Sequence, residues 1–231
     1  MSDAPTNKTA EWIHNAVKKN PCILLEDGNI RTCPVRLGFP HLFVPQPAMD
    51  EGKKPKYGAT LLFPASADLT ILREALAKCG AEKWGDKFTD YIGEESFHKP
   101  LQDQGKKKQF QGFVPGQFFV TATGERKPIV QDTRGALVVE EDRVQPGFWA
   151  FSIINPFAFE TRNKAGVVVK RGLSFGLNAV RLIAEDVTFG GSSIDPEKAF
   201  AGIDIEADVN PSGMFSGETG GAKAKSAADL L

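Results

Sequence analysis

Alternating apolar and polar residues, interrupted by glycine and proline, dominate the chain and predict short β-strands. The first candidate is residues 31–45, "RTCPVRLGFPHLFVP", where three prolines exclude a helix and Val35, Leu37 and Phe39 alternate with period two. A second candidate, residues 56–63, is followed by a proline. Further strands are predicted at residues 117–124, 136–140, 148–160, 166–170 and 174–186. Short strands punctuated in this way are typical of a sandwich or barrel rather than a parallel sheet.

Helical periodicity is clear in two segments. Residues 9–19 have one apolar face and predict a short helix. Residues 68–80, "DLTILREALAKCG", predict a stronger one, because leucines recur at spacings of three and four, Asp68 can cap the start and Gly80 is expected to end it. Residues 84–116 show no sustained period, and a long irregular insert inside a compact domain is usually functional or disordered.

The C-terminal part of the sequence differs from the rest. Turn-forming residues at 161–166, "TRNKAG", predict a hairpin, but after Gly190 the chain is mostly Gly, Ser, Ala and Asp, which predicts disorder. We therefore expect one domain over residues 1–190, of which 1–30 form an N-terminal extension with the short helix. Residues 191–231 are expected to form a flexible, mildly acidic tail.

Composition places the 231-residue chain among ordinary globular proteins, with 41% hydrophobic and 25% charged residues. It contains no run of 18 apolar residues that would predict a membrane span, and its polar N-terminus lacks the apolar segment of an export signal. The three cysteines and three histidines lack the spacing of a metal site, and the odd cysteine count argues against a disulfide framework. A reducing, cytoplasmic setting is expected.

Charge is unevenly distributed, although the formal net charge is only −1. From Glu185 to the end the chain has nine acidic and three basic residues, a net charge of −6, while the preceding 184 residues have 25 basic and 20 acidic residues, a net charge of +5. A mildly basic body with an acidic tail is compatible with a nucleic-acid-binding protein whose tail competes with the ligand. A tail that only increases solubility is the alternative.

No enzymatic signature accompanies this charge pattern. The sequence lacks the G-x-S-x-G, P-loop and H-E-x-x-H motifs, and the acidic triplet 140–142 would direct its adjacent carboxylates to different sides of a strand or turn. A two-metal nuclease would need carboxylates that converge on one site. We therefore predict a protein without catalytic residues, metal or cofactor, and expect the triplet to be a solvated turn.

Basic residues stand beside aromatic residues in six places, among them "GKKKQFQGF" at residues 105–113. An aromatic ring stacks on any nucleobase and a cation neutralises a phosphate, so the combination suits an unpaired nucleic acid without sequence readout. Solvated loops beside buried phenylalanines are the alternative. The stacking candidates are Tyr57, Phe97, Phe110 and Phe113. The phosphate-binding candidates are Lys53, Lys54, Lys56, Lys99, Lys106, Lys107, Lys108, Arg126, Lys127, Arg162, Lys164, Lys170 and Arg171. Residues 105–113 are expected to be a mobile binding loop with Phe110 more exposed than Phe113.

Long motifs in a fixed order support this interpretation. "VRLGFPHLFVPQ" is followed by "KYGATLLFP" and a predicted helix, then by "GQFFVTATGERKPIVQD", "VQPGFWAFSIINPFAFE" and "GLSFGLNAVRLIAEDVTFGG". Over residues 31–191 the chain resembles a phage-encoded family of single-stranded-DNA-binding proteins that was long catalogued as a domain of unknown function. The resemblance implies an OB-fold, a mainly β, five-stranded Greek-key barrel with one helix between strands and long loops, which binds oligonucleotides on one face. The motif residues Phe39, Pro40, Phe43, Tyr57 and Phe175 are compatible with core positions, so the resemblance assigns no binding residue.

The resemblance also implies a function. Proteins of this family coat and protect exposed single strands, without sequence preference, during phage DNA replication, recombination or repair in the cytoplasm of the infected bacterium. Related proteins often end in an acidic tail that occupies the DNA groove and recruits replication proteins, whereas here the acids are spread thinly and the chain closes with Lys223, Lys225 and "ADLL". The expected partners are single-stranded DNA and, through the tail, replication or recombination proteins, but no membrane. A β-rich virion or scaffold protein and a DNA-processing nuclease are the alternatives.

Overall fold

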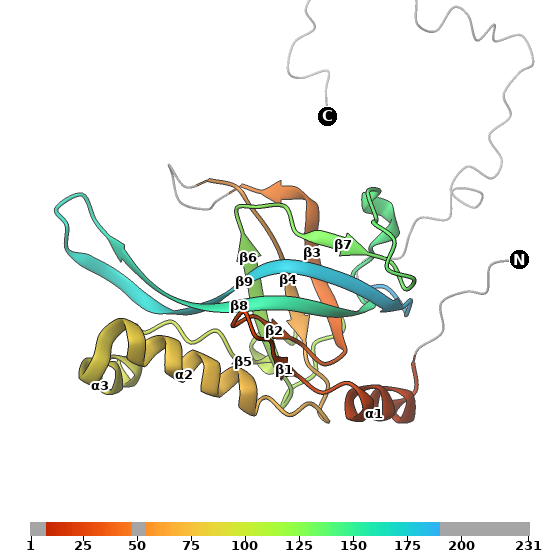
Figure 1. Cartoon of the computed structure of the whole chain (residues 1–231), viewed down its shortest axis with the longest axis horizontal. Coiled ribbons are helices and arrows are strands. Elements are labelled where there is room, and N and C mark those ends of the chain that lie inside the picture. The colour runs from red at the N-terminus through yellow and green to blue at the C-terminus, as the bar shows by residue number, and fades with distance from the viewer. Residues whose placement is uncertain (1–7, 48–53, 190–231) are drawn as a thin grey trace, which may run out of the picture. The chain divides into compact units, whose positions relative to one another are not determined.

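The computed structural model describes residues 8–47 and 54–189, which form a mainly β protein (Figure 1). The predicted tail, residues 191–231, and the candidate Lys53 lie outside the described residues, and the division of the chain at residue 190 stays a prediction. The helices are α1 (Ala10–Lys19), α2 (Thr70–Trp84) and α3 (Phe88–Gly93), with 3₁₀ turns η1 (Gly85–Lys87), η2 (Gln104–Lys107) and η3 (Glu141–Arg143). The strands are β1 (Ile23–Leu24), β2 (Ile30–Arg31), β3 (Val35–Gln46), β4 (Lys56–Leu62), β5 (Gln102–Asp103), β6 (Phe118–Gly124), β7 (Ile129–Gln131), β8 (Trp149–Arg162) and β9 (Val168–Ala184). No helix in the described ranges combines the length and hydrophobicity that crossing a membrane requires.

Five of the strands close into a barrel. β8 pairs with β3, β3 with β4 and β4 with β6, all antiparallel. β6 then pairs in parallel with β9, at Ala122 and Phe175, and β9 returns to β8 along a long antiparallel ladder. The circuit therefore closes in the order β3–β4–β6–β9–β8, which confirms the predicted five-stranded OB-fold barrel.

The alternation that is visible in the sequence sets the inner and outer faces of this barrel. In β4, Ala59 and Leu61 belong to the main core, and Thr60 between them points to the outer face. In β6, Val120 and Ala122 point inward in the same way. Small and polar residues are thereby left on the outside of the central strands.

β8 and β9 continue beyond the barrel as a long two-stranded arm (Figure 1). The Asn163 side chain accepts hydrogen bonds from two turn amides, and Gly166 adopts a φ of 78° that favours glycine, so the turn residues dictate where the chain reverses. The predicted hairpin at residues 161–166 is confirmed. Residues 166–170 and 174–186, predicted as separate strands, belong to one continuous strand, because the ladder to β8 runs through both segments.

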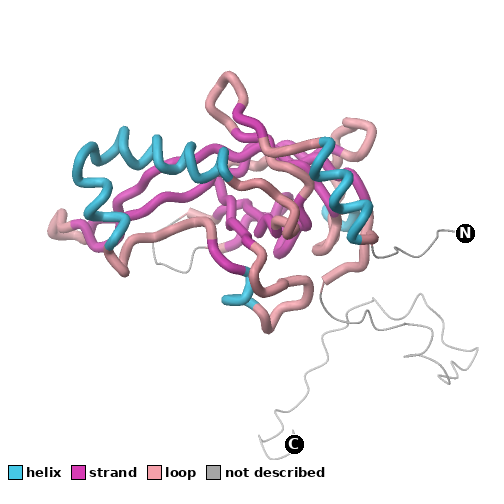
Figure 2. Tube along the Cα trace, turned by 90° about the horizontal axis from the view of Figure 1, so that it is seen from below, coloured by secondary structure: helices cyan, strands magenta, loops and turns pink. Residues whose placement is uncertain are grey.

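α2 and α3 lie along the arm (Figure 2), which extends the helical region beyond its predicted end. Gly80 does not end the helix: it is buried within α2, and a Cβ there would collide with the Phe88 ring of α3. The Trp84 indole stacks on the same ring, with centroids 6.0 Å apart and an interplanar angle of 12°. Glycine at position 80 therefore serves helix packing rather than termination, and α3 occupies part of the region 84–116 that was predicted as irregular.

Two strand predictions at the edges of the sheet also differ from the structure. Residues 136–140 form no strand and contribute only one bridge, between Gln131 and Leu137, while the strand lies earlier, in β7. Residues 31–45 divide into β2 and β3, which are consecutive strands bonded to the same partner, β8. The period-two signal is weak in such short segments, so pairing partners decide their limits.

Candidate nucleic-acid interface

The outer faces of β3, β4 and β6 form a trough, a surface cavity of about 340 Å³. Its floor is made of small residues, because Thr60 of β4 lies opposite Thr121 of β6, with their hydroxyl oxygens 3.5 Å apart. The strand has a glycine at position 58 because a Cβ there would lie 2.8 Å from the Ala122 carbonyl oxygen, and its lack of a side chain leaves the floor open. The other lining residues are Phe39, His41, Gln46, Pro47, Lys56, Tyr57, Ala59, Lys107 and Thr123. The trough thus combines a flat floor with two aromatic residues and two lysines.

Phe39 is brought to the trough by a break in β3. Its φ is +45°, the one positive value at a non-glycine residue within the described ranges, and the β3–β4 register shifts between Gly38 and His41. The extra residue of this bulge places the ring outside the barrel, where it is 40% exposed. A left-handed conformation at a bulky residue is unfavourable, and such strain is concentrated at functional sites.

Lys107 places a cation among these rings. Its ammonium lies 5.6 Å from the Phe39 centroid, 5.9 Å from Phe113 and 5.0 Å from Phe119, within cation–π range of all three. Partial burial lowers the pKa of Lys107 below its ordinary value. Phe110 completes the cluster, with its ring edge-on to Phe39 at 5.1 Å and 42% exposed.

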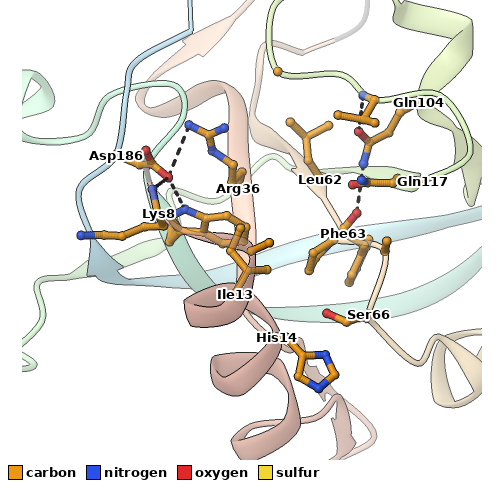
Figure 3. Close-up of a pocket in the computed structure, with 16 residues that line it drawn as sticks. Lys8, Ile13, His14, Arg36, Leu62, Phe63, Ser66, Gln104, Gln117 and Asp186 are labelled. Carbon is orange, nitrogen blue, oxygen red and sulfur yellow. Dashed lines mark hydrogen bonds and ion pairs between the residues drawn. The ribbon is translucent and has the colours of Figure 1, made fainter. Parts of the chain in front are cut away.

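The loop of residues 104–117 carries Lys107 and Phe110, and it is fixed at its base. The buried Gln104 amide donates to the Phe63 carbonyl at 3.1 Å and accepts from the Val114 amide at 2.8 Å (Figure 3). It also donates to the Phe118 carbonyl at 2.9 Å. The Asp103 carboxylate accepts from the backbone amides near both ends of the loop, at positions 105 and 116. The loop is therefore more constrained than the mobile segment that the sequence predicts.

A second group of cations gathers where β4 begins and β6 ends. Tyr57 pairs with Gly124, which brings the lysines that precede it close to the turn after β6. Lys54 contacts Glu125 at 3.4 Å, an exposed ion pair of small energetic value, and the Lys127 ammonium lies 5.2 Å from the Phe43 ring. The sequence candidates brought together here are Lys54, Lys56, Tyr57, Arg126 and Lys127.

The outer face continues from the trough to the arm. β6 and β9 pair at Ala122 and Phe175, which both point inward, so the preceding residues Thr121 and Ser174 share the outer face. Ser174 in turn lies opposite Phe157 of β8. Successive strands are about 4.8 Å apart, so the row from β4 to β8 spans roughly 14 Å.

Aromatic side chains extend this row along the arm. The ring centroids of Phe157 and Phe159 are 6.4 Å apart, and His98 lies 5.9 Å from Phe159. Gly172 permits this arrangement, because a Cβ there would lie 2.5 Å from the backbone oxygen of His98. Burial and then the charge of Lys170 hold the pKa of His98 below its ordinary value. These two effects favour the neutral ring, and exposed Lys170 supplies the positive charge beside it.

Two of the other cations predicted on the arm lie next to carboxylates. The Arg171 guanidinium lies 3.8 Å from the Tyr91 centroid and 4.0 Å from Glu94, which turns it toward α3 and away from the outer face. Arg162 is paired with the Glu160 carboxylate at 3.0 Å. The remaining loop and arm candidates, Lys99, Lys106, Lys108 and Lys164, are exposed.

Burial separates the predicted stacking residues. Phe97 is 4% exposed and packs against Trp84 at 5.6 Å, so its prediction as a stacking residue is wrong. Phe113 is 7% exposed and packs beneath Phe39, so its prediction as a stacking residue is wrong as well. Phe110, at 42%, is the more exposed of the two, as predicted. Phe39, interpreted from the sequence as compatible with the core, is the residue that sequence reasoning missed. The available signal was its place between Gly38 and Pro40, which interrupts the alternation.

A family model described as the single-stranded-DNA-binding protein of Enterobacter phage Enc34 matches residues 28–210. The chain belongs to this family. The resemblance noted in the sequence is thereby confirmed. A search of curated protein sequences gave no match.

Solved structures agree with the Enc34 family assignment at the level of the fold. The single-stranded-DNA-binding protein from bacteriophage Enc34 in complex with ssDNA is 20% identical, with a TM-score of 0.59 over 82% of this chain and 100% of that chain. A C-terminal truncation of the Enc34 protein is 19% identical, with a TM-score of 0.58 over 82% of this chain and 99% of that chain. Protein gp2.5 of bacteriophage T7, a single-stranded-DNA-binding protein, is 13% identical, with a TM-score of 0.50 over 71% of this chain and 95% of that chain.

The acidic triplet 140–142 does not line the trough of this Enc34 family member, but Glu141 and Asp142 share a neighbouring cavity with Phe39. Its residues are exposed, and part of it forms η3. Within residues 8–47 and 54–189, no three His, Cys, Asp or Glu side chains gather in a way that could hold a metal ion. The chemistry that the interface offers is ring stacking and charge neutralisation.

The Gln104 hydrogen bonds generate a stability prediction. Gln104→Ala removes the hydrogen bonds of this side chain to the Phe63 carbonyl and the Val114 amide. It also removes one of two bonds accepted by the Phe118 carbonyl, which keeps its bond from the Phe63 amide. We therefore expect a loss of roughly 2–5 kcal/mol in the free energy of unfolding. Chemical denaturation measures this change. The matched control is Gln109→Ala in the exposed part of the same loop, which should stay within about 0.5 kcal/mol of the wild type. Equal stabilities for the two variants would contradict the role of Gln104.

Proposed function

We propose that the protein binds single-stranded DNA without sequence preference through the trough, and that it coats and protects exposed strands during phage DNA replication, recombination or repair. It acts in the cytoplasm of the infected bacterium and is not an enzyme. The observation that carries the proposal is the cluster in which Phe39 and Phe110 expose ring faces or edges beside the Lys107 cation. Membership of the Enc34 family supports DNA binding over a virion or scaffold role.

The geometry favours an unpaired strand. A base stacks on a ring only when its own face is free, and the bases of a duplex are already stacked on one another. We place a base against Phe39 over the floor at Thr60 and Thr121, with neighbouring phosphates near Lys107 and Lys56. The two floor hydroxyls face each other, and the Gln46 amide contacts the His41 ring at 3.1 Å, so these polar groups are engaged with one another rather than with a base edge. Stacking without such readout tolerates every base.

The strand continues across the outer face toward the arm. The row from Thr60 through Thr121 and Ser174 to Phe157 gives it a direct course, and Phe159 with Lys170 repeats the pairing of ring and cation. OB-folds bind single strands across the central strands and the adjoining loops. The cations at the start of β4 then neutralise phosphates at the other end of the bound strand.

Salt dependence tests the proposal directly. Binding of a fluorescently labelled oligo(dT), followed by anisotropy, should weaken steeply as salt increases, with a log–log slope of about −0.7 for each phosphate neutralised. Oligonucleotides of other base composition should bind with similar constants. A flat plot would refute the proposal, and metal-dependent cleavage of the oligonucleotide would instead reveal a nuclease.

Phe39→Ala tests the stacking surface. Loss of one stacked base costs about 1–3 kcal/mol, so the dissociation constant for oligo(dT) should increase about 5- to 150-fold. The matched control is Phe151→Ala on β8, whose ring faces Arg31 at 5.7 Å and lies outside the trough. Equal affinities of both variants and the wild type would show that DNA binds elsewhere.

Removal of residues 191–231 tests the predicted tail. This segment carries seven acidic and three basic residues, so it can compete with DNA for the cations of the interface. We expect the truncated protein to bind oligo(dT) more tightly, most clearly at low salt. Full-length protein with Asn or Gln at the five acids between residues 195 and 208 should behave similarly. An unchanged or weaker constant would contradict competition by the tail.

A further inference from the structure

The last described segment, residues 185–189, lies against the rear of the loop 104–117. The Phe189 amide donates to the Pro146 carbonyl at 2.9 Å, which fixes the backbone at this point. Gly147 permits the approach, since it has a φ of 102° and a Cβ there would collide with the Val187 carbonyl oxygen. The segment is thus closely attached to the barrel immediately before the described chain ends.

The Phe189 side chain occupies a socket shared with the loop. Gly112 has a φ of 86°, and a Cβ at this position would collide with the Phe189 ring. The Arg36 guanidinium lies 4.2 Å from the centroid of that ring. Phe189 also packs against the small outer cluster that contains Phe113 and Phe119. The loop therefore has a glycine at position 112, where the Phe189 ring leaves no room for a side chain.

Arg36 gives the socket a fixed wall. Its guanidinium donates to the carbonyls of Gly147, at 2.9 Å, and Val187, at 2.8 Å. It also lies 3.7 Å from the Asp186 carboxylate (Figure 3). Asp186 is itself buried and accepts a hydrogen bond of 2.6 Å from the Trp149 indole. These bonds hold the Arg36 side chain in place. A change in the position of Phe189 would therefore displace the loop 104–117 rather than the barrel.

Contacts lead from Phe189 to the trough in two steps. Phe189 packs on the cluster of Phe113, and the Phe113 ring lies 6.1 Å from Phe39 and below the Lys107 ammonium. Phe189 itself is absent from the trough lining. It therefore touches the residues that support the stacking surface without belonging to that surface.

We propose that Phe189 is a positioning residue for DNA binding: it plugs the socket behind the loop and so sets the places of Phe113, Phe39 and Lys107. This inference rests on the proposed function of the trough. It also places the last described residue directly behind the DNA-binding loop. Any event that displaces Phe189 from Gly112 would lower the affinity for DNA.

A double-mutant cycle in the full-length protein tests the inference. Phe189→Ala should weaken binding of oligo(dT) about tenfold, at a temperature where circular dichroism shows the variant folded. In a Phe39→Ala background the same substitution should have a clearly smaller effect, because one of the groups that Phe189 positions is already gone. Phe189→Tyr, which keeps the planar ring, should restore most of the affinity. Phe151→Ala, which also removes a ring facing an arginine, should leave the affinity unchanged.

The outcomes separate this inference from the function on which it rests. If the wild type does not bind oligo(dT), the proposed function itself fails. If the wild type binds and Phe189→Ala binds equally well, or if its effect simply adds to that of Phe39→Ala, the positioning role is overturned. Should Phe189→Ala not fold, Gly112→Ala addresses the socket from the loop side and should give the same non-additive loss with Phe39→Ala, and additivity there would also overturn the inference.

Discussion

A strand directs its side chains alternately to two faces, so Phe39, two residues after the inward-facing Leu37, reaches the outside of the barrel only if that alternation is broken. The bulge at Phe39 makes this break, with a φ of +45° and a shifted register. A bulky residue in this conformation costs on the order of 1–3 kcal/mol, which the surrounding pairing must offset. The trough depends on it: without the outward ring, the floor of Thr60 and Thr121 would carry no stacking face next to Lys107.

The insertion between β4 and β6 contributes both to the packing of the arm and to the trough. Its first part forms α2 and α3, which cover the arm and bury Phe97 between Trp84 and Phe88. Its second part returns to the outer face as the loop 104–117, tied by Gln104 to the strands that flank the insertion. One connection thus stabilises the arm and also brings a lysine and an exposed ring to the trough, and Phe189 of the C-terminal segment packs behind that loop.

The basic side chains divide into those that accompany the outer face and those that are paired with carboxylates. Cations at the start of β4, in the loop and on the arm accompany the outer face, whereas Arg171 and Arg162 are engaged by Glu94 and Glu160. An arginine held by a carboxylate contributes less net positive charge to a phosphate track than a free lysine. The net charge of −1 therefore conceals an outer face on which positive charge is locally concentrated.

Sequence alone determined the class of fold, the hairpin at 161–166 and the pairing of rings with cations, because period-two alternation and turn chemistry are local properties. It also identified the loop 105–113 and the greater exposure of Phe110. Only the tertiary structure decided which rings face outward: Phe97 is buried by helices that pack around Gly80, and Phe39 is exposed by a bulge in β3. The side-chain direction of a phenylalanine depends on strand register and on the partner across the core, and neither is encoded within a few residues of it.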